Sequence, residues 1–148
     1  MREVHRRLRE ALWLARESVT EEPTLDLSAS PLLYCWGFCA ALSGHLGSED
    51  GALFPLVVEA HPDLAPVVAQ LTQDHHMIEY LIGALQRTIE QGAPTAEKLR
   101  HLDGIEALME SHFRYEERRL LGVLDGLRDL SLTGGQQLSA KDLFGPLA

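Results

Sequence analysis

Three histidine–glutamate pairs interrupt stripes of apolar residues that recur with helical spacing. The two members of each pair are four positions apart. The pairs are His45 with Glu49, His75 with Glu79, and His112 with Glu116. Residues four apart lie on one face of an α-helix, so both members of a pair point in the same direction. Because an apolar stripe faces the interior of a helical protein, we expect all three pairs to be buried.

Apolar periodicity and helix-terminating residues predict four long helices with short connections. The predicted helices span residues 2–19, 31–60, 64–91 and 96–130. Pro55 should kink or end the second helix near Phe54, because proline removes a backbone hydrogen bond. Neither strand alternation nor an internal repeat is evident. This pattern favours an all-α, up-down-up-down four-helix bundle with a metal site in its core.

The chain has 148 residues, which is the length of one domain. We assign residues 1–132 to the bundle and residues 133–148 to a C-terminal tail with one helical turn near Lys141–Phe144. Ser30 before Pro31 predicts the N-cap of the second helix. The glycines of Thr133–Gly135 should end the last long helix.

A fourth histidine, His5, lies on the predicted inward face of the first helix with Leu8 and Leu12. Burying an unpaired carboxylate costs several kcal/mol or more, whereas cations shared among the pairs would neutralise this charge. A single His-x-x-x-Glu pair is more often an exposed ion pair, but three of them on apolar stripes favour metal binding. Imidazole and carboxylate donors suit iron, manganese or zinc. The candidate ligands are His5, His45, Glu49, His75, Glu79, His112 and Glu116.

Composition and charge exclude several other classes of protein. The chain carries 13 Lys and Arg against 22 Asp and Glu, a net charge of −9, and nucleic-acid binding needs clustered positive charge. No apolar run reaches the roughly 20 residues of a membrane span, and the N-terminus lacks a signal peptide pattern. We therefore expect a cytoplasmic protein without nucleic-acid or membrane partners, a monomer or weak homo-oligomer. Cys35 and Cys39, one helical turn apart, should be small buried apolar residues rather than a disulfide.

Seven short segments carry a further signal: Val4–Arg9, Phe38–His45, Glu49–Asp50, Leu53–Pro55, Leu71, Asp74–His75 and His112–Arg118. Each segment is weakly specific alone, but together they are specific. On these segments the sequence resembles the hemerythrin-like family of HHE cation-binding domains, over roughly residues 4–124.

The resemblance implies a four-helix bundle that holds two non-haem iron ions, oxo-, hydroxo- or carboxylate-bridged. It implies that four histidines are terminal ligands: His5, His45, His75 and His112. It further implies that Glu49 and Glu116 bridge the two ions. An open position would remain for dioxygen, peroxide or nitric oxide.

Two positions depart from the family pattern. Many members carry a histidine pair where this chain has His45-Leu46, and oxygen carriers have a second histidine where this chain has Glu79. As an added anionic ligand, Glu79 would favour ferric iron and hence oxidative or peroxide chemistry over reversible dioxygen carriage. Asp50 and Glu117 directly follow candidate ligands, and either could hold a ligand imidazole, although solvated carboxylates are the commoner outcome.

Several functions remain open from the sequence. The first is a di-iron protein that reacts with dioxygen or peroxide, through catalase-like turnover or oxidation of a small molecule. The second is a reversible sensor or carrier of dioxygen or nitric oxide, and the third is iron handling without catalysis. A purely structural bundle would leave the buried carboxylates uncompensated.

Overall fold

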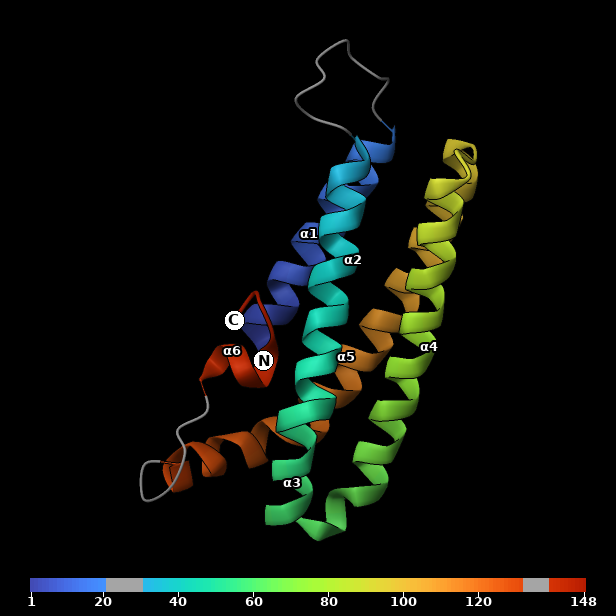
Figure 1. Ribbon diagram of the computed structural model, residues 1–148. Helices are drawn as coiled ribbons and strands as arrows, with labels where there is room; N and C mark the ends of the chain where they lie inside the picture. Colours follow the sequence, from blue (N-terminus) through green and yellow to red (C-terminus); the bar gives the residue numbers. More distant parts are fainter. Residues whose placement is uncertain (21–30, 132–138) are drawn as a thin grey trace.

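The computed structural model describes residues 1–20, 31–131 and 139–148 of the chain. Within these ranges every regular element is helical, which confirms the predicted all-α class. Four rods run alternately up and down in the view of Figure 1. They are α1 (Arg2–Thr20), α2 (Pro31–Ser48) with its continuation, α4 (Ala65–Glu90) and α5 (Thr95–Ser131). The predicted N-cap Ser30 and the predicted stop at 133–135 lie outside the described residues.

The second rod changes its hydrogen-bonding pattern where the sequence predicts an interruption. A π-helical segment, η1 (Glu49–Leu53), follows α2 and leads into α3 (Phe54–Ala60). The amide of Phe54 donates to the carbonyl of Glu49, five residues earlier, and Pro55 lies in the first turn of α3, where its missing N–H is tolerated. The rod therefore continues past Pro55 to Ala60 instead of ending at Phe54.

A short 3-10 turn, η2 (Pro62–Leu64), connects α3 to α4. Gly92, at the other end of α4, has a φ of 63°, a conformation that glycine adopts without steric cost. Two backbone hydrogen bonds, from Gly92 to Ile89 and from Ala93 to Thr88, close this turn. The chain then reverses into α5, which packs along α4 (Figure 1).

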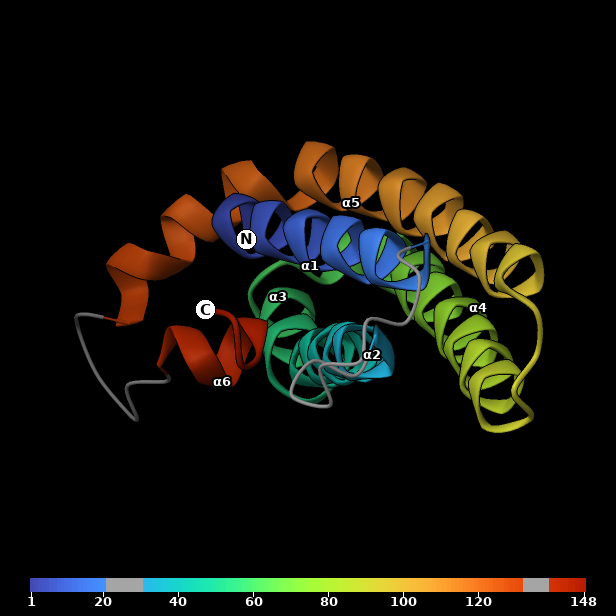
Figure 2. The ribbon, with the colours of Figure 1, turned by 90° about the horizontal axis from the view of Figure 1, so that it is seen from above.

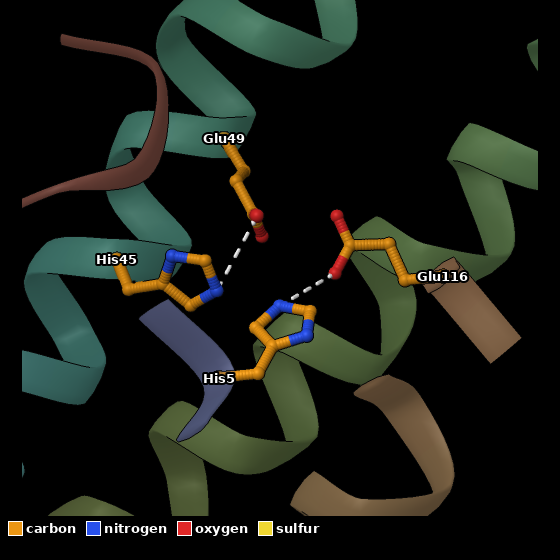
Figure 3. A group of neighbouring side chains, drawn as sticks. All are labelled: His5, His45, Glu49 and Glu116. Atoms are coloured by element: carbon orange, nitrogen blue, oxygen red, sulfur yellow. Dashed lines mark ion pairs between the residues drawn. The ribbon is translucent and has the colours of Figure 1, made fainter. Parts of the chain in front are cut away.

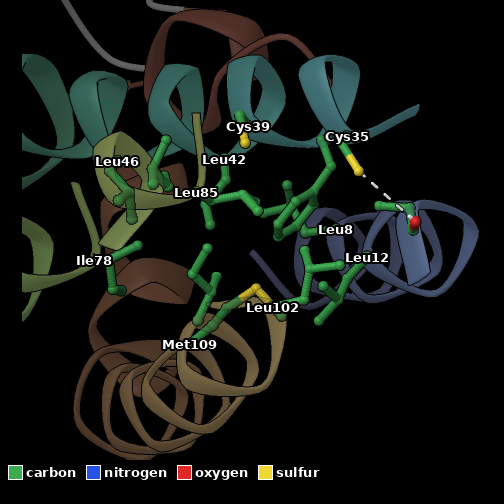
Figure 4. Close-up of a cluster of buried hydrophobic side chains, with 14 of the residues drawn as sticks. Leu8, Leu12, Cys35, Cys39, Leu42, Leu46, Ile78, Leu85, Leu102 and Met109 are labelled. Carbon is green, nitrogen blue, oxygen red and sulfur yellow. Dashed lines mark hydrogen bonds between the residues drawn. The ribbon is translucent and has the colours of Figure 1, made fainter. Parts of the chain in front are cut away.

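The rods pack around one interior, in which α1 contacts α2 and α5, and α4 contacts the same two rods. Figure 2 shows this arrangement from above. A large apolar cluster fills one half of the bundle (Figure 4). Its labelled members are Leu8, Leu12, Cys35, Cys39, Leu42, Leu46, Ile78, Leu85, Leu102 and Met109. Both cysteines are free and buried, as expected.

A second, smaller apolar cluster lies toward the other end of the bundle, with Leu53, Val57 and Leu120 among its buried members. Between the two clusters lies a layer of buried histidines and glutamates. The short helix α6 (Ala140–Phe144), at the position of the predicted tail turn, packs against α2 and η1. None of the described helices combines the length and apolar character needed to cross a bilayer.

Candidate metal centre

Four buried side chains from three rods converge on one point of the interior (Figure 3). They are His5 from α1, His45 from α2, Glu49 at the start of η1, and Glu116 from α5. One donor atom of each lies within 4.8 Å of the others. His5 Nε2 is 3.2 Å from Glu116 Oε2, and His45 Nε2 is 3.3 Å from Glu49 Oε1.

A second group of donors adjoins the first and shares one residue with it. Glu49, His75 and His112 also place one donor atom each within 4.8 Å of one another. The Nε2 atoms of His75 and His112 are 3.1 Å apart, and His75 Nε2 is 3.6 Å from Glu49 Oε2. The two oxygens of Glu49 thus face different histidines, which is the arrangement that a carboxylate bridging two cations requires.

Several buried nitrogen and oxygen atoms of this layer lack a hydrogen-bond partner, and a bound cation would compensate for this. Both oxygens of Glu49, both oxygens of Glu116 and the Nε2 atoms of His5 and His45 are buried and have no hydrogen-bond partner among the described residues. Buried polar atoms are almost always hydrogen-bonded, and an unpaired charge costs several kcal/mol. Neither donor group contains a cysteine. The donor set therefore fits iron, manganese or zinc bound through nitrogen and oxygen.

The opposite nitrogen of each ligand-type histidine faces an anchor of its own. His5 Nδ1 lies 2.8 Å from Glu117 Oε1, and His75 Nδ1 lies 3.0 Å from Asp50 Oδ1. The third anchor, Asp74 Oδ2, is 3.6 Å from His112 Nδ1. His45 Nδ1 is 2.9 Å from the backbone oxygen of Phe144, which belongs to α6. The contacts of His5 and His45 are hydrogen bonds and orient these two rings so that Nε2 points toward the centre, as outer partners of metal-binding histidines do. Asp50 and Asp74 place a negative charge beside the outer nitrogens of His75 and His112.

The wider turn of η1 brings two consecutive acidic residues to the same ring. Glu49 contacts His75 at Nε2, and Asp50 contacts it at Nδ1. The hydroxyl of Thr72 donates to Asp50 Oδ1 over 3.1 Å and so holds this anchor in place. Single π-turns within α-helical rods are frequent at functional sites.

Burial and neighbouring charge push the two carboxyl groups toward opposite protonation states. Burial raises the pKa of Glu49 well above its ordinary value, and the negative charge of Glu116 raises it further. Burial also opposes ionisation of Glu116, but the adjacent His5 ring outweighs it and lowers the pKa of Glu116 to about 2. Without a cation, burial and mutual repulsion therefore disfavour ionisation of both carboxyl groups together, and Glu116 ionises in preference to Glu49. A bound cation would favour ionisation of both.

The same burial keeps two of the imidazoles neutral. It lowers the pKa of His45 to about 3, an effect to which the nearby His5 adds, and it lowers the pKa of His112 to about 4. A neutral imidazole has a free lone pair on one nitrogen, which is the form that binds a metal. Both residues therefore need no proton loss at neutral pH before they coordinate.

Aromatic rings enclose the layer on two sides. Phe113 stacks on His5 with ring centroids 3.8 Å apart, and Phe54 stacks on His75 at 5.2 Å. All six converging side chains are at most 1% exposed. Contact with the centre is therefore restricted to small molecules that can pass between packed side chains.

Glu79 corrects the sequence-based expectation. We predicted that it faces the interior beside His75, but its side chain is exposed on α4 and accepts a hydrogen bond from the Ser43 hydroxyl. Neither donor group includes it. The structure thus brings together six of the seven candidate residues and leaves Glu79 outside. The argument for ferric iron that depended on a Glu79 ligand loses its basis.

Two anchors were not predicted from the sequence. Asp74 precedes His75 and was noted in the sequence only as part of a segment that resembles the family. Its contact with His112 depends on how α4 packs against α5. The Phe144 anchor is a backbone carbonyl, so no side-chain pattern could reveal it. Asp50 and Glu117, for which solvent exposure was the commoner expectation, both contact ligand-type histidines.

Comparison with known proteins gave one result. The family model described as the hemerythrin HHE cation binding domain matches residues 1–124. Searches of curated proteins and of solved structures gave no match. The matched range includes all six converging residues and ends before α6.

Proposed function

The chain belongs to the hemerythrin family of HHE cation-binding domains, and from this premise we propose that its buried layer holds two iron ions. The proposed ligands are His5, His45, Glu49, His75, His112 and Glu116. One observation carries the proposal: the two donor groups share Glu49, whose two oxygens face histidines from different groups. Iron at these positions would supply redox chemistry and open coordination sites for a small oxygen species.

We propose that the protein binds and reacts with dioxygen or peroxide at this centre. The side chains of the layer are at most 1% exposed, so a diatomic gas or peroxide fits the site better than an organic substrate does. Phe54 and Phe113 would exclude bulk water from the reacting molecule. This argument disfavours oxidation of a larger organic molecule and favours catalase-like turnover.

Reversible binding of dioxygen or nitric oxide is a second candidate, and the exposure of Glu79 supports it. The sequence-based argument against reversible carriage required Glu79 as an anionic ligand. With Glu79 bonded to Ser43 instead, the proposed ligand set contains two carboxylates and four imidazoles. Such a set is compatible with a stable ferrous form that binds a gas and releases it unchanged.

Two measurements on iron-loaded protein separate the candidates. Steady oxygen release after peroxide addition, over many turnovers per chain, supports the reactive centre. Reversible spectral changes of the reduced protein through repeated cycles of dioxygen exposure and removal support a sensor or carrier. Iron that exchanges freely, with neither response, would contradict both and favour iron handling.

A further inference from the structure

His45 differs from the other ligand-type histidines in the chemistry of its anchor. The Nδ1 atoms of His5, His75 and His112 each face a carboxylate, from Glu117, Asp50 and Asp74 respectively. The Nδ1 atom of His45 faces the carbonyl oxygen of Phe144 at 2.9 Å. A carbonyl oxygen only accepts hydrogen bonds, so this contact requires the proton on Nδ1. The lone pair of Nε2 is then directed toward Glu49.

The chain that supplies this carbonyl has a defined local structure. Ser139 and Asp142 form a reciprocal capping box at the start of α6, which satisfies two backbone amides of so short a helix. Gly145 ends α6 with a φ of 82°, a conformation that other residues adopt only with strain. These features fix the position of the carbonyl immediately before Gly145.

The backbone of Gly145 lies directly against the residue that it helps to orient. A Cβ atom at Gly145 would be 2.8 Å from the Cα of His45 and 2.9 Å from the carbonyl oxygen of Gly44. Both neighbours are backbone atoms of α2, which cannot move away as a flexible side chain would. Any side chain at position 145 would therefore displace residues 139–148 from α2.

Further contacts hold the C-terminal segment (residues 139–148) across two rods. The guanidinium of Arg7, on α1, donates to the carbonyl oxygen of Leu147 over 2.6 Å. Pro146 packs so closely on α2 that a Cβ at Gly44 would be 3.0 Å from its Cδ. The Phe144 side chain packs against both apolar clusters. The segment thus covers the centre from outside while it remains beyond the range of the family match.

From these contacts we infer that the C-terminal segment is a positioning element of the metal centre. It selects the Nδ1-protonated form of His45 through the Phe144 carbonyl and aims Nε2 at the donor group of His5, Glu49 and Glu116. This inference rests on the proposed metal function. It assigns a role in metal retention to residues that the family match does not cover.

The test uses the full chain with one substitution and a matched control. Gly145→Ala would force the segment away from His45, whereas Gly92→Ala also adds a methyl group at a glycine with positive φ, but there the new Cβ would have no neighbouring atom within 4 Å. Loss of an outer partner typically weakens metal affinity about 10- to 100-fold. In competition with a chelator, iron-loaded Gly145→Ala should therefore retain iron about 10- to 100-fold more weakly than Gly92→Ala. Equal retention by the two variants would overturn the inference.

A spectroscopic readout makes the inference independent of iron binding. In the metal-free protein, the ¹⁵N shifts of the His45 ring should report protonated Nδ1 in the unsubstituted chain and in Gly92→Ala. Gly145→Ala should show a mixture of the two neutral tautomers. The same tautomer in all three proteins would contradict the proposed role. If the unsubstituted chain holds no iron, the proposed function fails, and these shifts still decide whether the segment orients His45.

If Gly145→Ala does not fold, Gly44→Ala provides a milder displacement, because its new Cβ would press on Pro146 from within a helix. Alanine also favours the helix itself, so the fold of α2 should be retained. We expect weaker iron retention and a partial tautomer change in this variant. Iron retention and ring shifts identical to those of the unsubstituted chain would overturn the inference.

Discussion

The two halves of the bundle differ in whether their buried polar groups are hydrogen-bonded. In the apolar half, which contains Leu12, Leu85 and Leu102, the buried hydroxyls of Ser18 and Thr88 donate to backbone carbonyls of their own helices. In the ligand half, which contains the six converging histidines and glutamates, six buried nitrogen and oxygen atoms that face the centre have no hydrogen-bond partner among the described residues: the Nε2 atoms of His5 and His45 and all four oxygens of Glu49 and Glu116. The apolar half stabilises the fold, and the ligand half reduces stability unless cations bind.

This contrast gives a physical reason to assign different roles to residues that are equally buried. Leu85 and Glu49 are both fully buried, but burial of a leucine stabilises the folded state, whereas burial of an unpaired carboxylate destabilises it. Substitutions in the apolar half should therefore reduce stability without affecting metal content. Substitutions in the ligand half should change metal content first.

The largest effect on stability is expected in the apolar half. Leu85→Ala should lower the free energy of unfolding by about 2–5 kcal/mol, because it leaves a cavity in a packed cluster. Leu14→Ala, at an exposed position on α1, is the control and should change it by no more than about 0.5 kcal/mol. Urea unfolding followed by circular dichroism measures both. Equal losses, or a loss of iron from folded Leu85→Ala, would break the division between the halves.

A smaller effect, confined to metal affinity, is expected for an anchor in the ligand half. Asp50→Asn keeps the size of the side chain but removes the negative charge beside His75 Nδ1. Metal affinity should fall about 10- to 100-fold, as measured by chelator competition. Asp63→Asn, at an exposed position in η2, should leave affinity unchanged. An unchanged affinity in Asp50→Asn would mean that this contact does not tune the centre.

The pH dependence of the free energy of unfolding should show how far the buried Glu49 destabilises the metal-free fold. Because the pKa of Glu49 is raised in the folded metal-free protein above its ordinary value of 4.5, the folded state holds a proton that the unfolded chain releases. The free energy of unfolding contributed by Glu49 is therefore fully present below about pH 4.5 and is lost as pH rises through the folded-state pKa. The Glu49→Gln variant does not show this loss of stability, because a glutamine side chain does not ionise.

Metal-free Glu49→Gln should consequently be more stable than the unsubstituted metal-free protein at pH 8, by about 1–3 kcal/mol. The advantage should disappear below about pH 4.5. Urea titrations of both proteins across this range measure the difference, and the contributions of His45 and His112 cancel between them. A destabilised variant at pH 8 would show that Glu49 supports the fold without metal.

The smallest effect is expected at the residue that the structure removes from the site. Glu79→Ala should leave iron content unchanged and shift stability by no more than about 0.5 kcal/mol, because Glu79 is exposed. Glu116→Ala is the buried counterpart and should lose iron. A loss of iron from Glu79→Ala comparable to that from Glu116→Ala would restore Glu79 as a ligand.

Helical periodicity was sufficient to predict the long helices and the inward direction of five candidate pair members, together with His5. It failed at Glu79 for a geometric reason. On α4 the buried positions Leu71, Ile78 and Ile82 define an inward direction, and Glu79 lies nearly a quarter turn from it at about 100° per residue. Spacing from His75 alone places Glu79 near the edge of the stripe, where the rotation of the packed helix decides its exposure.

Other features of the site lay beyond any reading of side-chain patterns. The π-turn at Glu49 arises from a shift in backbone hydrogen bonding, although Pro55 indicated that the regular pattern would be interrupted nearby. The Phe144 carbonyl reaches His45 only because α6 folds back onto α2. Such contacts depend on tertiary packing between residues 99 positions apart, which local propensity does not encode.

The central claim is that the ligand half holds two iron ions, and metal analysis of the purified full chain tests it most directly. After expression with sufficient iron, we predict two irons per chain, and a marked loss of iron in a Glu49→Gln/Glu116→Gln variant that retains its helical circular dichroism. A folded chain that contains no iron, manganese or zinc, or a double variant that binds iron as well as the unsubstituted protein does, would contradict it.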